Sequence, residues 1–107
     1  MNYKIETLPQ FDKDVKKLKK RFPKLKEDLK LLIKALNKNP ELGTHLESGI
    51  FKIRLQNSSI PTGKSSGFRV ITYYLRNEKL YLVTMYSKAD KDSILTPKLK
   101  AIIAKEL

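Results

Sequence analysis

The stretch of sequence that decides the fold is FRVITYYL-RNEK-LYLVTMY, residues 68–86. Its two flanks, 68–75 and 80–86, are rich in Val, Ile, Leu, Tyr and Thr, residue types that favour β-strands. The short link between the flanks suits a hairpin, so the two strands should pair antiparallel. A third strand is predicted at 50–55, IFKIRL, where alternation places Lys52 and Arg54 on the face opposite Phe51, Ile53 and Leu55.

Two amphipathic helices precede these strands. Apolar residues recur at helical spacing from 11 to 22 and again from 25 to 36, and Pro23 separates the two stripes. Residues 3–8 alternate weakly and suit a short first strand. Near the other end, Thr96-Pro97 is typical of an N-cap followed by proline at the first helical position, which predicts a C-terminal helix.

The predicted order is therefore β-α-α-β-β-β-α, an α+β fold. An N-terminal helical hairpin should pack on one face of an antiparallel sheet and leave the other face available for a ligand. No internal repeat or linker is visible, and 107 residues are enough for one hydrophobic core but not for two, so a single domain is expected.

The charge of the chain points to a polyanionic partner. The chain has 23 Lys and Arg against 11 Asp and Glu, a net charge of +12, and both halves share the excess. A folded domain with this charge repels itself unless a polyanion lies nearby, and nucleic acid is the commonest one. A lysine-rich surface that only keeps the protein soluble explains the charge equally well, so composition leaves both interpretations open.

The same composition excludes several kinds of chemistry. Without cysteine the chain has no disulfide, thiolate metal site or cysteine nucleophile. Its single His45, expected in the link between helix and strand, cannot build a histidine cluster and is expected to be a surface or capping residue. We therefore expect no metal and no cofactor. No apolar run reaches the roughly 18 residues of a membrane span, and the first residues lack a leader pattern, so a cytoplasmic protein is expected.

Gly63-Lys64-Ser65, in the loop 56–66, is similar to the end of a phosphate-binding P-loop. The first glycine of that pattern would fall at Ser58, and a strand follows instead of a helix, so nucleotide binding is not expected. Lys64 keeps two interpretations, a contact with an RNA phosphate or an exposed loop lysine.

Cations within the strands are the most informative feature. Lys52 and Arg54 share a face, and Arg69 interrupts an otherwise apolar strand. Charged residues seldom lie within a sheet unless they are paired or face solvent. Because Lys88 and Lys91 directly follow the last strand, all five cations could gather around one groove. The alternative is that each simply points to water.

Together these segments resemble the RelE/ParE superfamily of toxin–antitoxin toxins. The resemblance covers nearly the whole chain and rests on the element order, the helix ending in Asn39-Pro40, and the segments 51–54, 67–74 and 86–91. Residues 63–67 with the following Tyr-Ser-Lys are most similar to the HigB-type branch. The resemblance implies a RelE-like fold and a metal-independent endoribonuclease that cleaves mRNA in the ribosomal A site and is silenced by an antitoxin.

The resemblance also implies which residues act. By position the resemblance matches four cations to family catalytic residues, Lys52, Arg54, Arg69 and Lys91, and Lys88, which directly follows the last strand, is a further catalytic candidate. The residues expected to contact RNA are Lys64, Tyr86, Lys16 and Lys20. RelE has a tyrosine in its C-terminal segment where this chain has Leu95, so Tyr86 is the substitute that the chain offers.

These residue types suit RNA cleavage, because RNA carries its own nucleophile, the 2′-hydroxyl. Arg54 and Arg69 suit the phosphate, since a guanidinium stays charged and donates two parallel hydrogen bonds. A lysine is the first candidate for the general base and Asp90 the second, while Lys88 or Lys91 would steady the leaving oxygen.

Two other functions compete with this hypothesis. A ParE-like inhibitor of DNA gyrase needs no basic catalytic cluster, and the four matched cations therefore favour the nuclease. A non-catalytic RNA-binding module would be expected to carry the stacking aromatics of an RRM, which the strands do not show clearly. The expected partners are the ribosome, mRNA and an acidic antitoxin segment that folds on the basic surface or displaces the C-terminal helix, forming a hetero-oligomer.

Overall fold

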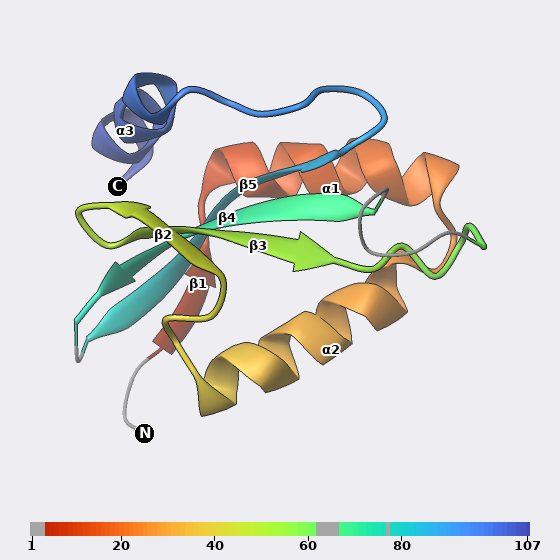
Figure 1. Cartoon of the computed structure of the whole chain (residues 1–107), viewed down its shortest axis with the longest axis horizontal. Helices are drawn as coiled ribbons and strands as arrows, with labels where there is room; N and C mark the ends of the chain where they lie inside the picture. Colours follow the sequence, from red (N-terminus) through yellow and green to blue (C-terminus); the bar gives the residue numbers. More distant parts are fainter. Residues whose placement is uncertain (1–3, 62–66, 77) are drawn as a thin grey trace.

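The predicted hairpin lies at the centre of a five-stranded sheet. In the computed structural model, which describes residues 4–61, 67–76 and 78–107, β4 (Phe68–Leu75) and β5 (Lys79–Ser87) pair antiparallel. β3 (Ile50–Leu55) pairs antiparallel with the other side of β4. The order across the sheet is β1-β5-β4-β3-β2 (Figure 1).

The two outer strands complete the sheet. β1 (Lys4–Thr7) pairs parallel with β5, and β2 (Thr44–Glu47) pairs antiparallel with β3. β2 was not predicted, and His45 lies within it instead of in a link. The order is therefore β-α-α-β-β-β-β-α, which confirms the α+β class and the helical hairpin and adds one short strand.

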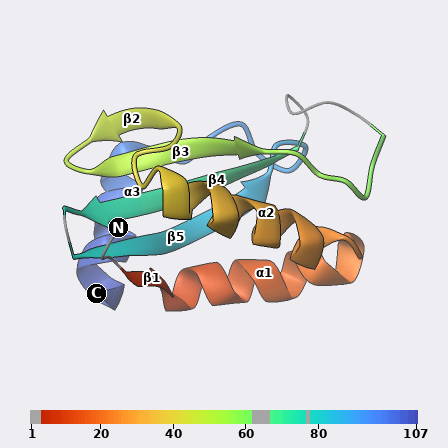
Figure 2. The ribbon, with the colours of Figure 1, turned by 90° about the horizontal axis from the view of Figure 1, so that it is seen from below.

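Helices α1 (Pro9–Arg21) and α2 (Leu25–Lys38) cover one face of the sheet, as predicted (Figure 2). Their apolar stripes meet alternate residues of β3, β4 and β5 in the larger core cluster. Leu25 and Leu36 of α2 are fully buried there, as is Phe68 of β4. Burial of this apolar stripe is what holds the helical hairpin on the sheet.

The opposite face is not wholly open, which corrects the expectation. Helix α3 (Thr96–Glu106) packs across it, and its Leu99 is completely buried against Ile50, Ile71 and Val83. Alternation along the strands places these apolar residues on the same face as the strand cations, so they need a cover of their own. The N-cap is Leu95, one residue before the expected Thr96.

Helix α3 does not pack over one end of this face. The cluster beneath the helix includes Ile71 and Val83 but not Arg69 or Tyr86, which lie farther along β4 and β5. At that end, where β3 and β5 finish and β4 begins, Arg54 is exposed, whereas Arg69 and Tyr86 are only 5% and 4% exposed. Within the described residues, no helix is both long and apolar enough to cross a membrane.

Candidate nucleic-acid interface

A row of three polar residues crosses this end of the sheet. Arg54 of β3 lies directly opposite Arg69 of β4, which in turn lies directly opposite Tyr86 of β5. Opposite residues of antiparallel strands share a face, with Cβ atoms about 5 Å apart. The neighbouring Leu55, Phe68 and Met85 are in the core beneath α1 and α2, so the row lies on the other face.

Two like charges placed directly opposite one another destabilise a sheet. Arg54 is exposed, whereas Arg69 is only 5% exposed, and its Nη1 donates a hydrogen bond to the Phe68 carbonyl oxygen at 3.2 Å. A guanidinium cannot lose its proton to relieve this repulsion. A guanidinium donates two parallel hydrogen bonds to a phosphate, so the exposed Arg54 is suited to bind one.

Tyr86 closes the row as a buried proton donor. Its side chain is 4% exposed, and its hydroxyl makes no hydrogen bond with any described residue. Burial raises the pKa of the Tyr86 hydroxyl, the nearby charge of Arg69 acts in the opposite direction, and Asp92 raises it again. The raised pKa keeps the phenol protonated at neutral pH and makes it a weaker acid than an exposed tyrosine.

The turn that follows β5 holds Lys91 beside Tyr86. Backbone N–H groups of Asp90 and Lys91 both donate to the Ser87 carbonyl oxygen, at 2.9 and 3.3 Å. Asp90 also accepts two hydrogen bonds from Arg21 of α1, at 2.6 and 3.2 Å. The Lys91 Nζ consequently lies 5.9 Å from the centre of the Tyr86 ring, within the range of a cation–π contact.

Asp90 is thereby a poor candidate for the general base. Its hydrogen bonds with Arg21 lower its pKa, an effect that burial opposes and that the charges of Arg21 and Lys91 reinforce. A carboxylate stabilised in its charged form takes up a proton less readily at neutral pH. Its position indicates a structural role, as the anchor between the turn and α1.

The remaining catalytic candidates lie around the row. Lys52 is half-buried, two residues before Arg54 on the same face of β3, and lies opposite Ile71. Lys88 is paired with Asp92, because its Nζ donates to the Asp92 carboxylate at 3.1 Å. Asp92 is 94% exposed, so this surface pair contributes little stability and is easily broken.

The cations do not share one enclosed pocket in the described part of the chain. Lys52 and Arg54 line a hollow of about 610 Å³ at the outer edge of β3, next to α2. Tyr86 and Lys91 line a smaller hollow of about 190 Å³ between β5 and α1. Arg69 lies between the two on β4, so the arrangement is a basic band across the sheet end with a hollow at each side.

Helix α1 contributes cations that the sequence analysis did not select. Lys16 and Lys20 are exposed and do not line the hollow beside Tyr86, whereas Lys17 and Arg21 do. The signal that could have found them is their four-residue spacing, which places both on the helix side next to Asp14. Asp14 packs that side on β5, where it accepts from the Thr84 hydroxyl and, at 3.1 Å, from the Met85 N–H.

Two other sequence candidates lie elsewhere. Lys64 is outside the described residues. His45 is exposed in β2, accepts a hydrogen bond from the Gly49 N–H at 3.3 Å and contacts the Phe51 ring, with centroids 5.0 Å apart. This is the surface position expected for it. Among the described residues, no three His, Cys, Asp or Glu side chains are grouped as metal ligands.

Comparison with protein-family models finds no match to this chain, and comparison with curated proteins finds none either.

Proposed function

We propose that this chain is a toxin of the RelE/ParE type, HigB-like, that cleaves ribosome-bound mRNA in the cytoplasm without a metal ion. The row of Arg54, Arg69 and Tyr86 with Lys91 beside it is the observation that carries the proposal. Opposed arginines next to a protonated phenol supply two of the three things that RNA cleavage needs from a protein, namely phosphate binding and proton donation, and the third is a base.

The reaction assigned to this row is transfer of a phosphodiester to the adjacent 2′-oxygen. The 2′-oxygen forms a bond to phosphorus and the bond from phosphorus to the 5′-oxygen breaks, which gives a 2′,3′-cyclic phosphate and a free 5′-hydroxyl. Arg54 and Arg69 hold the non-bridging oxygens. Tyr86 donates a proton to the leaving 5′-oxygen, and Lys91 adds positive charge beside it.

The proton of the 2′-hydroxyl needs an acceptor. Lys52 is the first candidate, since it lies next to Arg54 on the same face and is half-buried. Lys88 is the second and would first have to leave Asp92. Replacing each of them separately with methionine, which keeps the side-chain length, identifies the base as the one whose loss removes cleavage at every pH.

Substitution of Arg69 tests the proposal. Arg69→Ala should lower cleavage of ribosome-bound mRNA by about 10²- to 10³-fold, the loss that follows removal of one donor to transition-state charge. Arg76→Ala, at an exposed residue of the β4–β5 hairpin, is the matched control and should cleave normally. Because Arg69 is buried, exposed Arg54→Ala provides a second variant that should lose cleavage while it stays folded.

Three outcomes would overturn the proposal. Undiminished cleavage by both arginine variants would remove the row from the chemistry. RNA that stays intact after prolonged incubation with translating ribosomes would indicate a binding module without catalysis. Inhibition of DNA supercoiling by gyrase, measured in parallel and without mRNA cleavage, would favour the ParE-like alternative. A cognate antitoxin with an acidic segment is the partner that the proposal includes, together with the ribosome and mRNA.

A further inference from the structure

The part of β5 that carries Tyr86 has no strand along its outer side. β1 pairs with β5 only as far as Leu82, whose carbonyl oxygen accepts a hydrogen bond from the Leu8 N–H at 3.0 Å. Beyond Leu82, in the described part of the chain, β4 is the only strand beside β5. Alternation along the strand directs every second backbone N–H to the outer side, and the N–H of Met85 is one of them. This N–H needs an acceptor from outside the sheet.

Asp14 of α1 supplies that acceptor. Its Oδ2 accepts hydrogen bonds from the Met85 N–H, at 3.1 Å, and from the Thr84 hydroxyl. Its Oδ1 accepts a hydrogen bond from the Gln10 Nε2 at 3.0 Å, four residues earlier on the same helix. Both carboxylate oxygens are therefore engaged, and at this point of β5 the side chain takes the place of a partner strand.

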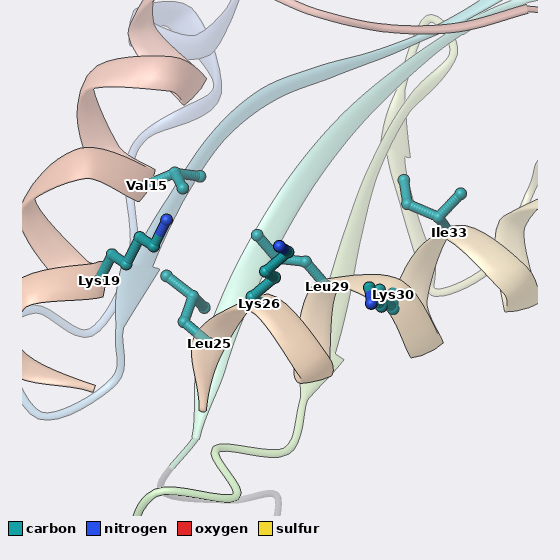
Figure 3. A pocket seen from close by; sticks show the side chains of 7 residues that line it. All are labelled: Val15, Lys19, Leu25, Lys26, Leu29, Lys30 and Ile33. Carbon is teal, nitrogen blue, oxygen red and sulfur yellow. The ribbon is translucent and has the colours of Figure 1, made fainter. Parts of the chain in front are cut away.

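Helix α1 uses separate sides for α2 and for the end of β5. Figure 3 shows Val15 and Lys19 extending from α1 into the hollow between the two helices. Asp14 and Arg21 instead line the hollow beside Tyr86, and their spacing of seven residues corresponds to about two helical turns. One side of α1 thus faces the strand that carries the proposed proton donor.

The direction of the Tyr86 side chain depends on this backbone anchor. The Tyr86 hydroxyl has no hydrogen-bond partner among the described residues, so no such bond fixes the tip of the side chain. Its direction is set by the backbone of β5 and by the groups packed around the ring. Asp14 holds that backbone at Met85, one residue before Tyr86. A displacement of about 1 Å in a reacting group can cost about 10²-fold in rate, so such an anchor matters for catalysis.

We infer that Asp14 is a positioning residue, which holds β5 at Thr84 and Met85 and thereby directs the Tyr86 hydroxyl toward the leaving oxygen of the RNA. The inference rests on the proposed function, which supplies the substrate and the role of Tyr86 as proton donor. Asp14 itself is assigned no contact with RNA and no proton transfer. The competing interpretation is that Asp14 only attaches α1 to the sheet.

Substitution of Asp14 is the first test. Asp14→Ala removes the acceptor and should lower the cleavage rate at saturating ribosome-bound mRNA by about 10- to 10²-fold. The half-saturating ribosome concentration should stay within about twofold of the wild-type value, because substrate binding is not assigned to Asp14. Asp14→Asn keeps an oxygen atom that can accept from the Met85 N–H and should recover most of the rate.

Val15→Ala is the matched control on the other side of α1. Val15 packs against the core beneath the helical hairpin, so its truncation should lower the thermal midpoint. Its cleavage rate should stay within about twofold of the wild-type rate, since the contact between α1 and β5 is retained. A loss of cleavage in Val15→Ala as large as in Asp14→Ala would overturn the inference, because any loosening of α1 would then be sufficient.

A double-mutant cycle with Tyr86→Phe separates the two interpretations. If Asp14 acts through the Tyr86 hydroxyl, Asp14→Ala/Tyr86→Phe should cleave within about threefold of Tyr86→Phe alone. If Asp14 only attaches α1 to the sheet, Asp14→Ala should cause the same loss with and without that hydroxyl. Equal losses in the two backgrounds would overturn the inference and leave the proposed nuclease intact.

A fluorine NMR measurement tests the positioning without RNA. In protein labelled with 3-fluorotyrosine, Tyr86→Phe identifies the signal of Tyr86 among those of the five tyrosines. Asp14→Ala should shift and broaden this signal, Asp14→Asn should restore it, and Val15→Ala should leave it in place. An unchanged signal in Asp14→Ala would overturn the inference. Wild-type protein that leaves RNA intact would instead overturn the proposed function, and the fluorine signal would still decide whether Asp14 orients Tyr86.

Discussion

Tyr86 is the residue on which the proposed chemistry depends most. A buried hydroxyl without a partner is costly for the folded protein, by about 1–3 kcal/mol in general. Asn57 Nδ2 and Thr72 Oγ1 are also buried without a hydrogen-bond partner among the described residues, so the unpaired Tyr86 hydroxyl does not by itself mark a functional site. Sequence reasoning found Tyr86 as a member of a family segment, but its burial and unpaired hydroxyl depend on tertiary packing that no local pattern reveals.

Tyr86→Phe separates a functional hydroxyl from a structural one. Removing a hydroxyl that has no partner among the described residues should leave the thermal midpoint unchanged or slightly higher. Cleavage of ribosome-bound mRNA should nevertheless fall by about 10²-fold, because the proton donor is lost. A variant that unfolds more easily and cleaves normally would show that the hydroxyl serves the fold.

The turn after β5 is the element that connects the sheet end to α1. Its anchor, the pair between Arg21 and Asp90, joins residues 69 positions apart in the chain. The two carboxylate oxygens of Asp90 both accept from the guanidinium, so the turn is fixed in angle as well as in position. Lys91 follows directly and is thereby placed beside Tyr86.

Asp90→Asn should loosen this anchor. The folded-state pKa of Asp90 is lowered, so the pair stabilises the protein above the carboxyl's ordinary pKa, and this contribution disappears as the pH falls through the lowered value. Urea unfolding at pH 7 and pH 3 should show a smaller acid-induced loss for Asp90→Asn than for the wild type. Asp12→Asn, an exposed acid of α1 that forms no ion pair among the described residues, is the control and should lose stability as the wild type does.

Most helices and strands were predictable from the sequence because each repeats its apolar pattern over enough residues for the pattern to be recognised. The helices of the hairpin and the strands β3, β4 and β5 each repeat their pattern over at least six residues. β2 has only four residues, most of them exposed, and depends on β3 for its pairing. The cover formed by α3 was missed because the cations on that face suggested an open surface, although Ile50 and Ile71 share it.

The candidate site was less predictable than the fold. Alternation shows that Arg54 and Arg69 lie on a face of their own strands, but it does not fix the register between strands separated by the loop 56–66. A shift by one residue would move the two guanidinium groups to opposite faces. The resemblance selected Arg54, Arg69 and Tyr86, but only the structure shows that they are aligned across the sheet.

At the scale of the whole molecule, a net charge of +12 should attract any polyanion. Attraction of this kind is sensitive to salt, since each phosphate contact releases counterions. The charge alone does not distinguish the basic band from the rest of the surface. The number of RNA phosphates contacted through particular residues distinguishes the basic band from the rest of the surface.

The salt dependence of RNA binding measures that number. Lys52→Ala/Arg54→Ala should reduce the slope of log K against log salt concentration by about 1.4 for single-stranded RNA, at about 0.7 per phosphate contact. Lys98→Ala/Lys105→Ala removes the same charge from α3 and should leave the slope nearly unchanged. Equal reductions in both variants would show that RNA binds the surface without preference for the sheet end.

Gly67 sets the spacing at this end of the sheet. A methyl group on Gly67 would collide with the Leu55 carbonyl oxygen, and the Gly67 carbonyl accepts the Lys88 N–H at 2.9 Å. Strand ends from β3, β4 and β5 can approach this closely because nothing larger than a hydrogen atom stands between them. The distance between the backbone at the end of β3 and the backbone at the start of β4 is thus set by a residue that has no side chain.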